Sequence, residues 1–190
     1  MTSLLISRLA RVLLAAGVLA LAYAAFVAID AWVYQRQMRV QLAQPAPSGL
    51  AVPVPLADGD PIGRILIPRL GIAVVFVQGE SDAILRRAVG HLTDTALPGV
   101  TGNVVLAGHR DTFFRPLKDV RVGDAITITT RAGTFSYVVE SAFVVTPADV
   151  HVLDATGGRT LTLITCFPFY YVGPAPDRFI VRAREVAAGI

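Results

Sequence analysis

The stretch of sequence that decides the fold is TLTLITC, residues 160–166, followed at once by Phe-Pro-Phe at 167–169. Threonines alternate with leucine and isoleucine here, as in a β-strand with one buried face, and the aromatic and proline residues end the pattern. If Leu161 and Leu163 face a core, Cys166 lies on the opposite, more polar face at the end of the strand. A lone cysteine is often an inert buried residue, but this position favours a reactive thiol.

Further short strands separated by turn residues follow residue 61, and they predict an all-β barrel or sandwich. A hairpin with Arg131-Ala132-Gly133 as its loop is the clearest turn. Helical patterns are short: one over 81–88, capped by Ser81, and one over 112–120. The expected strands are 63–68, 72–77, 103–107, 125–130, 134–145, 160–165 and 179–184.

The N-terminal segment is apolar enough to cross a membrane. Val12 to Ile29 carries no charge over 18 residues, and Arg8 and Arg11 precede it. A helix of that length nearly spans a bilayer core, and the flanking arginines predict a cytoplasmic N-terminus with the rest of the chain outside. A cleaved signal peptide, cut near residues 22–24, is the alternative; the apolar run continues past that point, which favours an uncleaved anchor.

The chain therefore divides into three parts. Residues 1–34 form the cytoplasmic N-terminus and the transmembrane anchor. Residues 35–61 form a helical, then Pro-rich, extracytoplasmic linker that holds the domain off the membrane surface. Residues 62–190 form the β-rich domain.

Charge and cysteine content exclude some partners and some sources of stability. The net charge is +3, and no basic run with interleaved aromatic residues is present, so we expect no nucleic-acid partner. One cysteine cannot form an internal disulfide, so the exported domain must be stabilised by an ordinary core.

A nucleophilic cysteine acts as its thiolate and needs cationic neighbours. Three histidines are candidates. His109 ends the strand NVVLA and its Ala-Gly turn, His91 follows the first short helix, and His151 lies in a loop. We favour His109 because strand-end residues converge at one rim of a sheet.

An arginine is the natural third member, since its planar fork donates two hydrogen bonds and stays charged. Arg178 begins the last strand, 12 residues after Cys166. The intervening Gly/Pro-rich loop lets neighbouring antiparallel strands bring residues 166 and 178 together. Arg182 and Arg184 share its parity, and we expect both on a solvent face.

The segments AGHRDTFF, TLITC and APDRFIVRA, in this order, closely resemble the sortases. ALPG, GNVVLAGHRDTFF and TLITCFPFYYVG are most similar to the class D branch. The resemblance covers about residues 62–184. It implies a closed β-barrel of about eight strands, preceded by a transmembrane helix, with cysteine transpeptidase activity.

Site residues follow from the same resemblance. Cys166 is then the nucleophile, His109 the acid/base partner, and Arg178 the group that steadies the substrate carbonyl or oxyanion. Thr165 matches a substrate-binding position, whereas His91 matches a recurrent histidine that is not catalytic. The calcium-binding acidic cluster of the family has no clear counterpart, so no metal or other cofactor is expected, and modulation by calcium is left open.

The resemblance further implies a membrane-anchored enzyme that cleaves an LPxTG-like C-terminal sorting signal of surface proteins through a thioester. The acceptor is an amine, either of a peptidoglycan cross-bridge or of a protein lysine. A shielded groove favours transfer over hydrolysis, and the aromatic residues 167 and 169–171 are either its wall or core. The alternatives are a cysteine endopeptidase or thioesterase with the same dyad, and a non-catalytic, membrane-tethered peptide-binding barrel.

Overall fold

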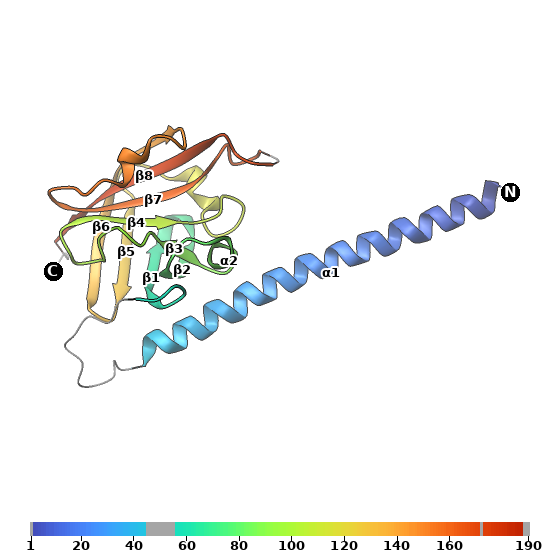
Figure 1. Ribbon diagram of the computed structural model, residues 1–190, viewed down its shortest axis with the longest axis horizontal. Coiled ribbons are helices and arrows are strands. Elements are labelled where there is room, and N and C mark those ends of the chain that lie inside the picture. The colour runs from blue at the N-terminus through green and yellow to red at the C-terminus, as the bar shows by residue number, and fades with distance from the viewer. Residues whose placement is uncertain (1, 45–55, 172, 188–190) are drawn as a thin grey trace.

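A computed structural model describes residues 2–44, 56–171 and 173–187. It contains one long helix, a barrel of strands and short helical turns between them (Figure 1). In chain order the elements are α1 (Thr2–Ala43), β1 (Pro61–Ile67), η1 (Pro68–Leu70), β2 (Ile72–Gln78), α2 (Asp82–Leu85), β3 (Val89–His91), β4 (Gly102–Ala107), η2 (Arg115–Asp119), β5 (Ala125–Thr130), β6 (Gly133–Val145), η3 (Val150–Leu153), β7 (Arg159–Phe167) and β8 (Asp177–Val186).

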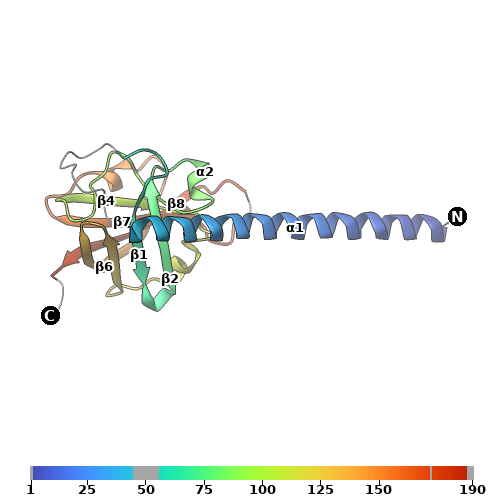
Figure 2. The ribbon, with the colours of Figure 1, turned by 90° about the horizontal axis from the view of Figure 1, so that it is seen from below.

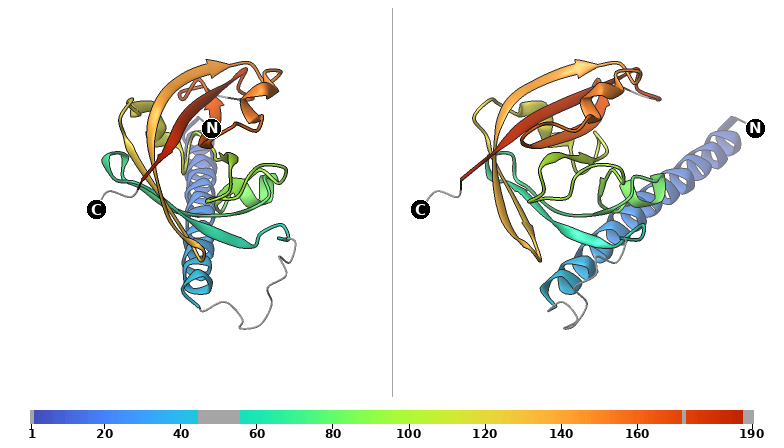
Figure 3. Two further views of the ribbon diagram at one scale, coloured as in Figure 1. Left: turned by 90° about the vertical axis from the view of Figure 1, so that its left-hand side faces the viewer. Right: turned by 60° about the vertical axis from the view of Figure 1, so that its left-hand side comes forward.

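The strands close into one barrel in the order β1-β2-β3-β4-β7-β8-β6-β5, with β5 pairing back to β1. This confirms the predicted closed barrel of about eight strands. Most neighbours are antiparallel, but β4 and β7 run parallel, as do β2 and β3. Figure 3 shows the strands curving around a common interior. The parallel pair matters most, because it carries the ends of β4 and β7 to the same rim.

The barrel interior is filled by alternate residues of the strands. Leu161 and Leu163 of β7 are fully buried there, as the alternation in the sequence predicts. Each large aliphatic side chain removed from water contributes about 1.5–3 kcal/mol, so this layer accounts for much of the fold's stability. Other strands supply Ile65, Ile67, Phe76, Val104, Leu106, Ile126, Ile128, Tyr137, Val139, Val181 and Ala183.

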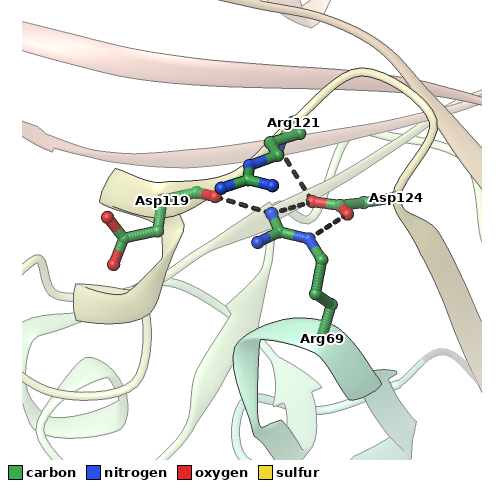
Figure 4. A network of polar contacts seen from close by, with 4 residues as sticks. All are labelled: Arg69, Asp119, Arg121 and Asp124. Carbon is green, nitrogen blue, oxygen red and sulfur yellow. Dashed lines mark hydrogen bonds and ion pairs between the residues drawn. The ribbon is translucent and has the colours of Figure 1, made fainter.

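One end of the barrel is covered by η2, because Phe114 and Leu117 are fully buried in the core. Arg69 of η1 fastens this cover (Figure 4). Its guanidinium pairs with the Asp124 carboxylate and donates to the Asp119 carbonyl at 2.6 Å. The Arg69 hydrogen bond, together with the Arg121 amide, lowers the pKa of Asp124.

Three local predictions differ from the structure. The strand β3 was not expected, because three residues are too few to show an alternating pattern. The helix α2 follows Ser81 as predicted, but the Ser81 side chain makes no capping hydrogen bond. The turn predicted over 112–120 is a 3₁₀ helix over 115–119.

Among the described residues α1 is the one helix long and apolar enough to cross a membrane. Its N-terminal half projects beyond the barrel, and its C-terminal half crosses β1 and β2 (Figures 1 and 2). The helix continues to Ala43, so the predicted helical start of the linker is confirmed.

The helical part of this stretch contacts the barrel directly. The Gln35 side chain accepts a hydrogen bond from the Val75 amide at 2.7 Å and donates to the Val75 and Arg87 carbonyls. A small buried cluster forms around Met38 on the same face of α1. The helix is therefore packed on the barrel, and the distance of the barrel from a membrane surface stays a prediction. Residues 45–55, the Pro-rich part of the linker, lie outside the described residues.

Candidate active site

Cys166 lies near the end of β7, in the middle of three adjacent strands. β4 pairs with one side of β7 and β8 with the other. Leu161, Leu163 and Thr165 point to the interior, so Cys166 shares the outer face with Thr162 and Ile164. Its thiol is free and partly exposed. The strand thus presents the thiol outside the core, as its sequence predicts.

Arg178 lies directly opposite Cys166 in the antiparallel β7–β8 register. Its Nη1 donates to the carbonyls of Asp177 at 2.9 Å and Ala175 at 3.3 Å, which holds the guanidinium against the loop that joins the two strands. The structure therefore brings together the two residues that the sequence separates by a Gly/Pro-rich loop.

The two later arginines of β8 behave differently from each other. Arg184 is exposed and pairs with Glu140 at 2.9 Å, so its predicted place on a solvent face is confirmed. Arg182 is only partly exposed, and its Nη2 donates to the Val152 carbonyl of η3 at 3.0 Å. The prediction of a solvent-facing Arg182 is therefore wrong, because η3 folds over this part of the sheet.

His109 reaches the same rim from the other side of β7. The parallel β4–β7 ladder ends with Ala107 opposite Ile164, and the Gly108 amide continues it by donating to the Ile164 carbonyl at 3.1 Å. His109 follows directly, at the level of Cys166. Its carbonyl accepts from the Phe114 amide at 3.1 Å, which folds the next loop back over the barrel end.

Gly108 makes this approach feasible. A Cβ built there would lie 2.8 Å from the Phe114 ring, closer than carbon atoms pack. The Thr165 hydroxyl is buried and donates to the Gly108 carbonyl at 2.7 Å. The Thr165 side chain therefore ties the end of β7 to the turn before His109. Its substrate-binding role stays a prediction.

The other two histidines lie elsewhere. His91 is buried in β3, where its ring nitrogens contact the Gln78 side-chain oxygen and the Ala96 carbonyl, both at 3.0 Å. Burial lowers the pKa of His91, although the Ala96 carbonyl opposes that shift. His91 is therefore a structural histidine of the barrel. His151 is exposed on η3.

An apolar groove of about 270 Å³ lies beside the candidate site. Its floor is formed by Ala107, Ile164 and Ile180 from β4, β7 and β8, and Arg178 lies at one end. Ile164 and Ile180 are two residues from Cys166 and Arg178 and share their faces of the strands. The groove therefore borders the site through Arg178, while Cys166 and His109 are not among its lining residues. A larger hollow of about 700 Å³ lies between α1 and β2, and Cys166, His109 and Arg178 do not line it.

The far wall of the groove is η3, which is held by hydrogen bonds from side chains of the sheet beneath it. The Val152 carbonyl accepts from both Asn103 and Arg182, and Asn103 in turn accepts from the buried Thr162 hydroxyl at 2.7 Å. These polar contacts on the outer face of the sheet were not predicted, because the partners lie 30 to 59 residues apart. They fix the width of the groove.

The aromatic residues after Cys166 divide between core and surface. Phe167, Phe169 and Phe179 form one cluster, with ring centroids 5.3 to 6.3 Å apart, and Phe169 and Phe179 pack on the core. Tyr170 and Tyr171 are exposed. The two tyrosines are thus the most exposed of these rings, and the phenylalanines are partly buried.

No group of three histidine, cysteine, aspartate or glutamate side chains that would hold a metal ion occurs within the described ranges. The candidate site itself contains one thiol, one imidazole and one guanidinium. Such a set suits acyl transfer, with a nucleophile, an acid/base and a donor to developing negative charge.

The comparisons with known proteins agree on one family. The sortase domain model matches residues 65–186. Sortase D of Bacillus subtilis (strain 168) is 33% identical over 129 residues, covering 67% of this chain and 65% of that protein. Sortase A of Streptococcus agalactiae serotype III (strain NEM316) is 29% identical over 137 residues, covering 67% and 54%. The chain thus spans about half to two thirds of the length of these relatives.

Solved structures give the same result. A Clostridium perfringens Sortase D5 transpeptidase superposes with a TM-score of 0.64 at 30% identity, covering 80% of this chain and 88% of that chain. Sortase C-1 from Actinomyces oris superposes with a TM-score of 0.62 at 28% identity, covering 84% and 86%.

Proposed function

The chain belongs to the sortase family, and from this premise we propose that it is a membrane-anchored cysteine transpeptidase of the class D type. It cleaves an LPxTG-like C-terminal sorting signal of surface proteins and transfers the protein to an amine acceptor. The observation that carries the proposal is the meeting of three strand ends, with Cys166 opposite Arg178 in register and His109 level with Cys166, two residues beyond the end of β4.

The first step forms the thioester. The Cys166 thiolate attacks the carbonyl carbon of the scissile peptide, whose preceding apolar side chains lie in the groove. Arg178 donates to the oxygen as negative charge develops there. The C–N bond then breaks, and the His109 imidazolium gives its proton to the leaving amine.

The second step transfers the acyl group. A primary amine, from a peptidoglycan cross-bridge or a protein lysine, attacks the thioester carbonyl and loses a proton to the His109 imidazole. The Cys166 thiolate leaves and the new amide is released. The cycle restores the thiolate–imidazolium pair and needs no cofactor.

A fluorogenic sorting peptide offered with an amine tests the proposal. Cys166→Ala should abolish turnover. Arg178→Lys should lower kcat by roughly 10²–10³-fold, as loss of an oxyanion donor does, because a point charge cannot reproduce the fork. Arg184→Lys, on the solvent-facing pair with Glu140, is the matched control and should be near wild type.

Product analysis and a chelator complete the test. Formation of the amide with the added amine supports transfer, whereas hydrolysis alone would make the protein a cysteine endopeptidase or thioesterase. Full turnover by Cys166→Ala would remove the proposed nucleophile. Turnover should be unchanged by a chelator, and a loss restored by calcium would contradict the metal-free scheme.

A further inference from the structure

Arg110, the residue after His109, makes an unusual set of contacts. Its Nη1 donates to the Pro168 carbonyl at 3.1 Å, and its Nη2 donates to the carbonyls of Tyr171 and Gly173 at 2.8 and 2.9 Å. The guanidinium also lies over the Tyr171 ring, 5.8 Å from its centroid. One side chain therefore binds three carbonyls of a single loop.

The position of that loop gives these contacts their importance. It begins just after Cys166 and ends at Arg178, so it joins the proposed nucleophile to the proposed oxyanion donor. Arg110 lies three residues beyond the end of β4 and directly follows the proposed acid/base, His109. Its guanidinium is thus a direct link between the strand of His109 and the segment between Cys166 and Arg178.

The loop is held at both ends by guanidinium–carbonyl bonds. Arg178 binds Ala175 and Asp177 near the end of the loop, while Arg110 binds its first part. The register of β7 and β8 places residues 166 and 178 opposite each other, but it does not fix the path of the chain between them. The three Arg110 bonds supply that constraint.

Only arginine can make this arrangement. Its guanidinium is planar and directs several N–H groups in a fixed fork, so it reaches carbonyls on two sides at once. Lysine carries the same charge as a point and would reach one carbonyl well. Lys118 of η2 illustrates the difference, since its ammonium contacts the loop through one hydrogen bond, to the exposed Tyr170 hydroxyl at 2.9 Å.

We infer that Arg110 is a positioning residue of the active site, which holds the loop between Cys166 and Arg178 in register with His109. This inference rests on the proposed transpeptidase function. It assigns Arg110 no contact with substrate. Its effect is on the placement of the Arg178 guanidinium, which donates one hydrogen bond to the loop at the Ala175 carbonyl and another to Asp177, where the loop meets β8.

The test compares Arg110→Ala and Arg110→Lys in the full chain. Misplacement of an active-site group by about 1 Å costs around 100-fold, so we expect kcat to fall by about 10- to 100-fold in both variants. KM for the sorting peptide should change less than about threefold, because Arg110 does not line the apolar groove proposed to bind the peptide. Amide exchange over residues 167–177 should become faster.

Arg131→Ala is the matched control, since Arg131 also donates to a backbone carbonyl, that of Gln41 at 2.7 Å, in an exposed position. It should leave kcat, KM and exchange of the 167–177 loop near wild type. Alkylation of Cys166 by iodoacetamide should be similar in all variants, which shows that the thiol and the fold are intact. Arg110→Lys keeps the charge and the aliphatic stem, so it remains informative if Arg110→Ala does not fold.

Two outcomes would overturn the inference while leaving the proposed function standing: a kcat for both Arg110 variants equal to that of Arg131→Ala, or a fall in kcat without faster loop exchange. Absence of Cys166-dependent turnover in the wild type would instead remove the proposed function. The exchange measurement then still decides whether Arg110 orders the loop.

Discussion

Gly108 separates the last residue of β4 from His109, and the Phe114 ring occupies the space where a side chain would be. Any Cβ here must displace either the ring that covers the barrel end or the backbone that positions His109. The sequence suggests a close approach at this glycine, and the structure identifies the neighbour. At the scale of one residue, the packing of Phe114 on the core and the placement of the proposed acid/base thus both require that residue 108 has no side chain.

Gly108→Ala should therefore affect stability and activity together. We expect a loss of about 1–3 kcal/mol in the free energy of unfolding, as overpacking usually costs, and about a tenfold lower kcat because His109 is displaced. Denaturant unfolding and peptide turnover measure the two effects. Gly157→Ala, where nothing lies within 4 Å of the added Cβ, is the control. Wild-type values at Gly108→Ala would contradict the packing argument.

His91 makes the fold sensitive to mild acid. Burial lowers its pKa in the folded state, so below about pH 6.5 the unfolded chain binds a proton that the folded chain resists. The free energy of unfolding should fall as the pH drops from 7 to 5. Asp124, whose pKa is also lowered, contributes only in more acidic solution, where its unfolded carboxyl is protonated.

Chemical denaturation at several pH values measures this dependence. His91→Gln keeps an amide that can hydrogen-bond Gln78 and Ala96, and it should flatten the slope between pH 7 and 5. An equally steep slope in this variant would assign the sensitivity to another group.

At the scale of elements, the strands that carry the candidate site were predictable and their supports were not. Alternation in TLTLITC gives the face of Cys166, and the Gly/Pro-rich loop before Arg178 indicates an antiparallel return. The strand β3 has no pattern of its own and forms because β2 and β4 pair with it. The Arg110 and Arg182 bonds join residues far apart in sequence, and no local pattern encodes them.

The docking of α1 is a second feature that the sequence conceals. Gln35 looks like one of several polar residues after a membrane anchor, but its side-chain amide pairs with both backbone groups of Val75, as a neighbouring strand would. The β2 strand pairs with β3 only from Phe76 onward. Gln35 therefore completes the free part of that edge.

Gln35→Ala should leave the Val75 amide without a partner. Because unsatisfied buried groups cost about 1–3 kcal/mol, we expect a loss of that size in the free energy of unfolding and faster exchange of the Val75 amide. Gln37→Ala, at an exposed position on the same helix, should change neither. Unchanged exchange at Val75 would show that α1 does not stay on the barrel in solution.

At the scale of the whole molecule, one helix would both anchor the protein and support its domain. The apolar run of α1 predicts that the chain stays in the membrane uncleaved, with the barrel outside the cell. A tag at the N-terminus should therefore remain attached to the barrel in the membrane fraction and resist extraction by carbonate. Protease added to intact spheroplasts should digest the barrel and spare the tag. A barrel released without the tag would indicate signal cleavage instead.

The Gln35 contact has one more consequence if α1 crosses the bilayer. A catalytic domain on a flexible linker samples many positions above the membrane. A barrel packed against its own transmembrane helix instead keeps its active site at one height and orientation. Substrate proteins would then have to bring their C-terminal sorting signals to that position. The length of the flexible segment before each sorting signal would then decide which substrates are processed. Movement of the enzyme domain would matter less.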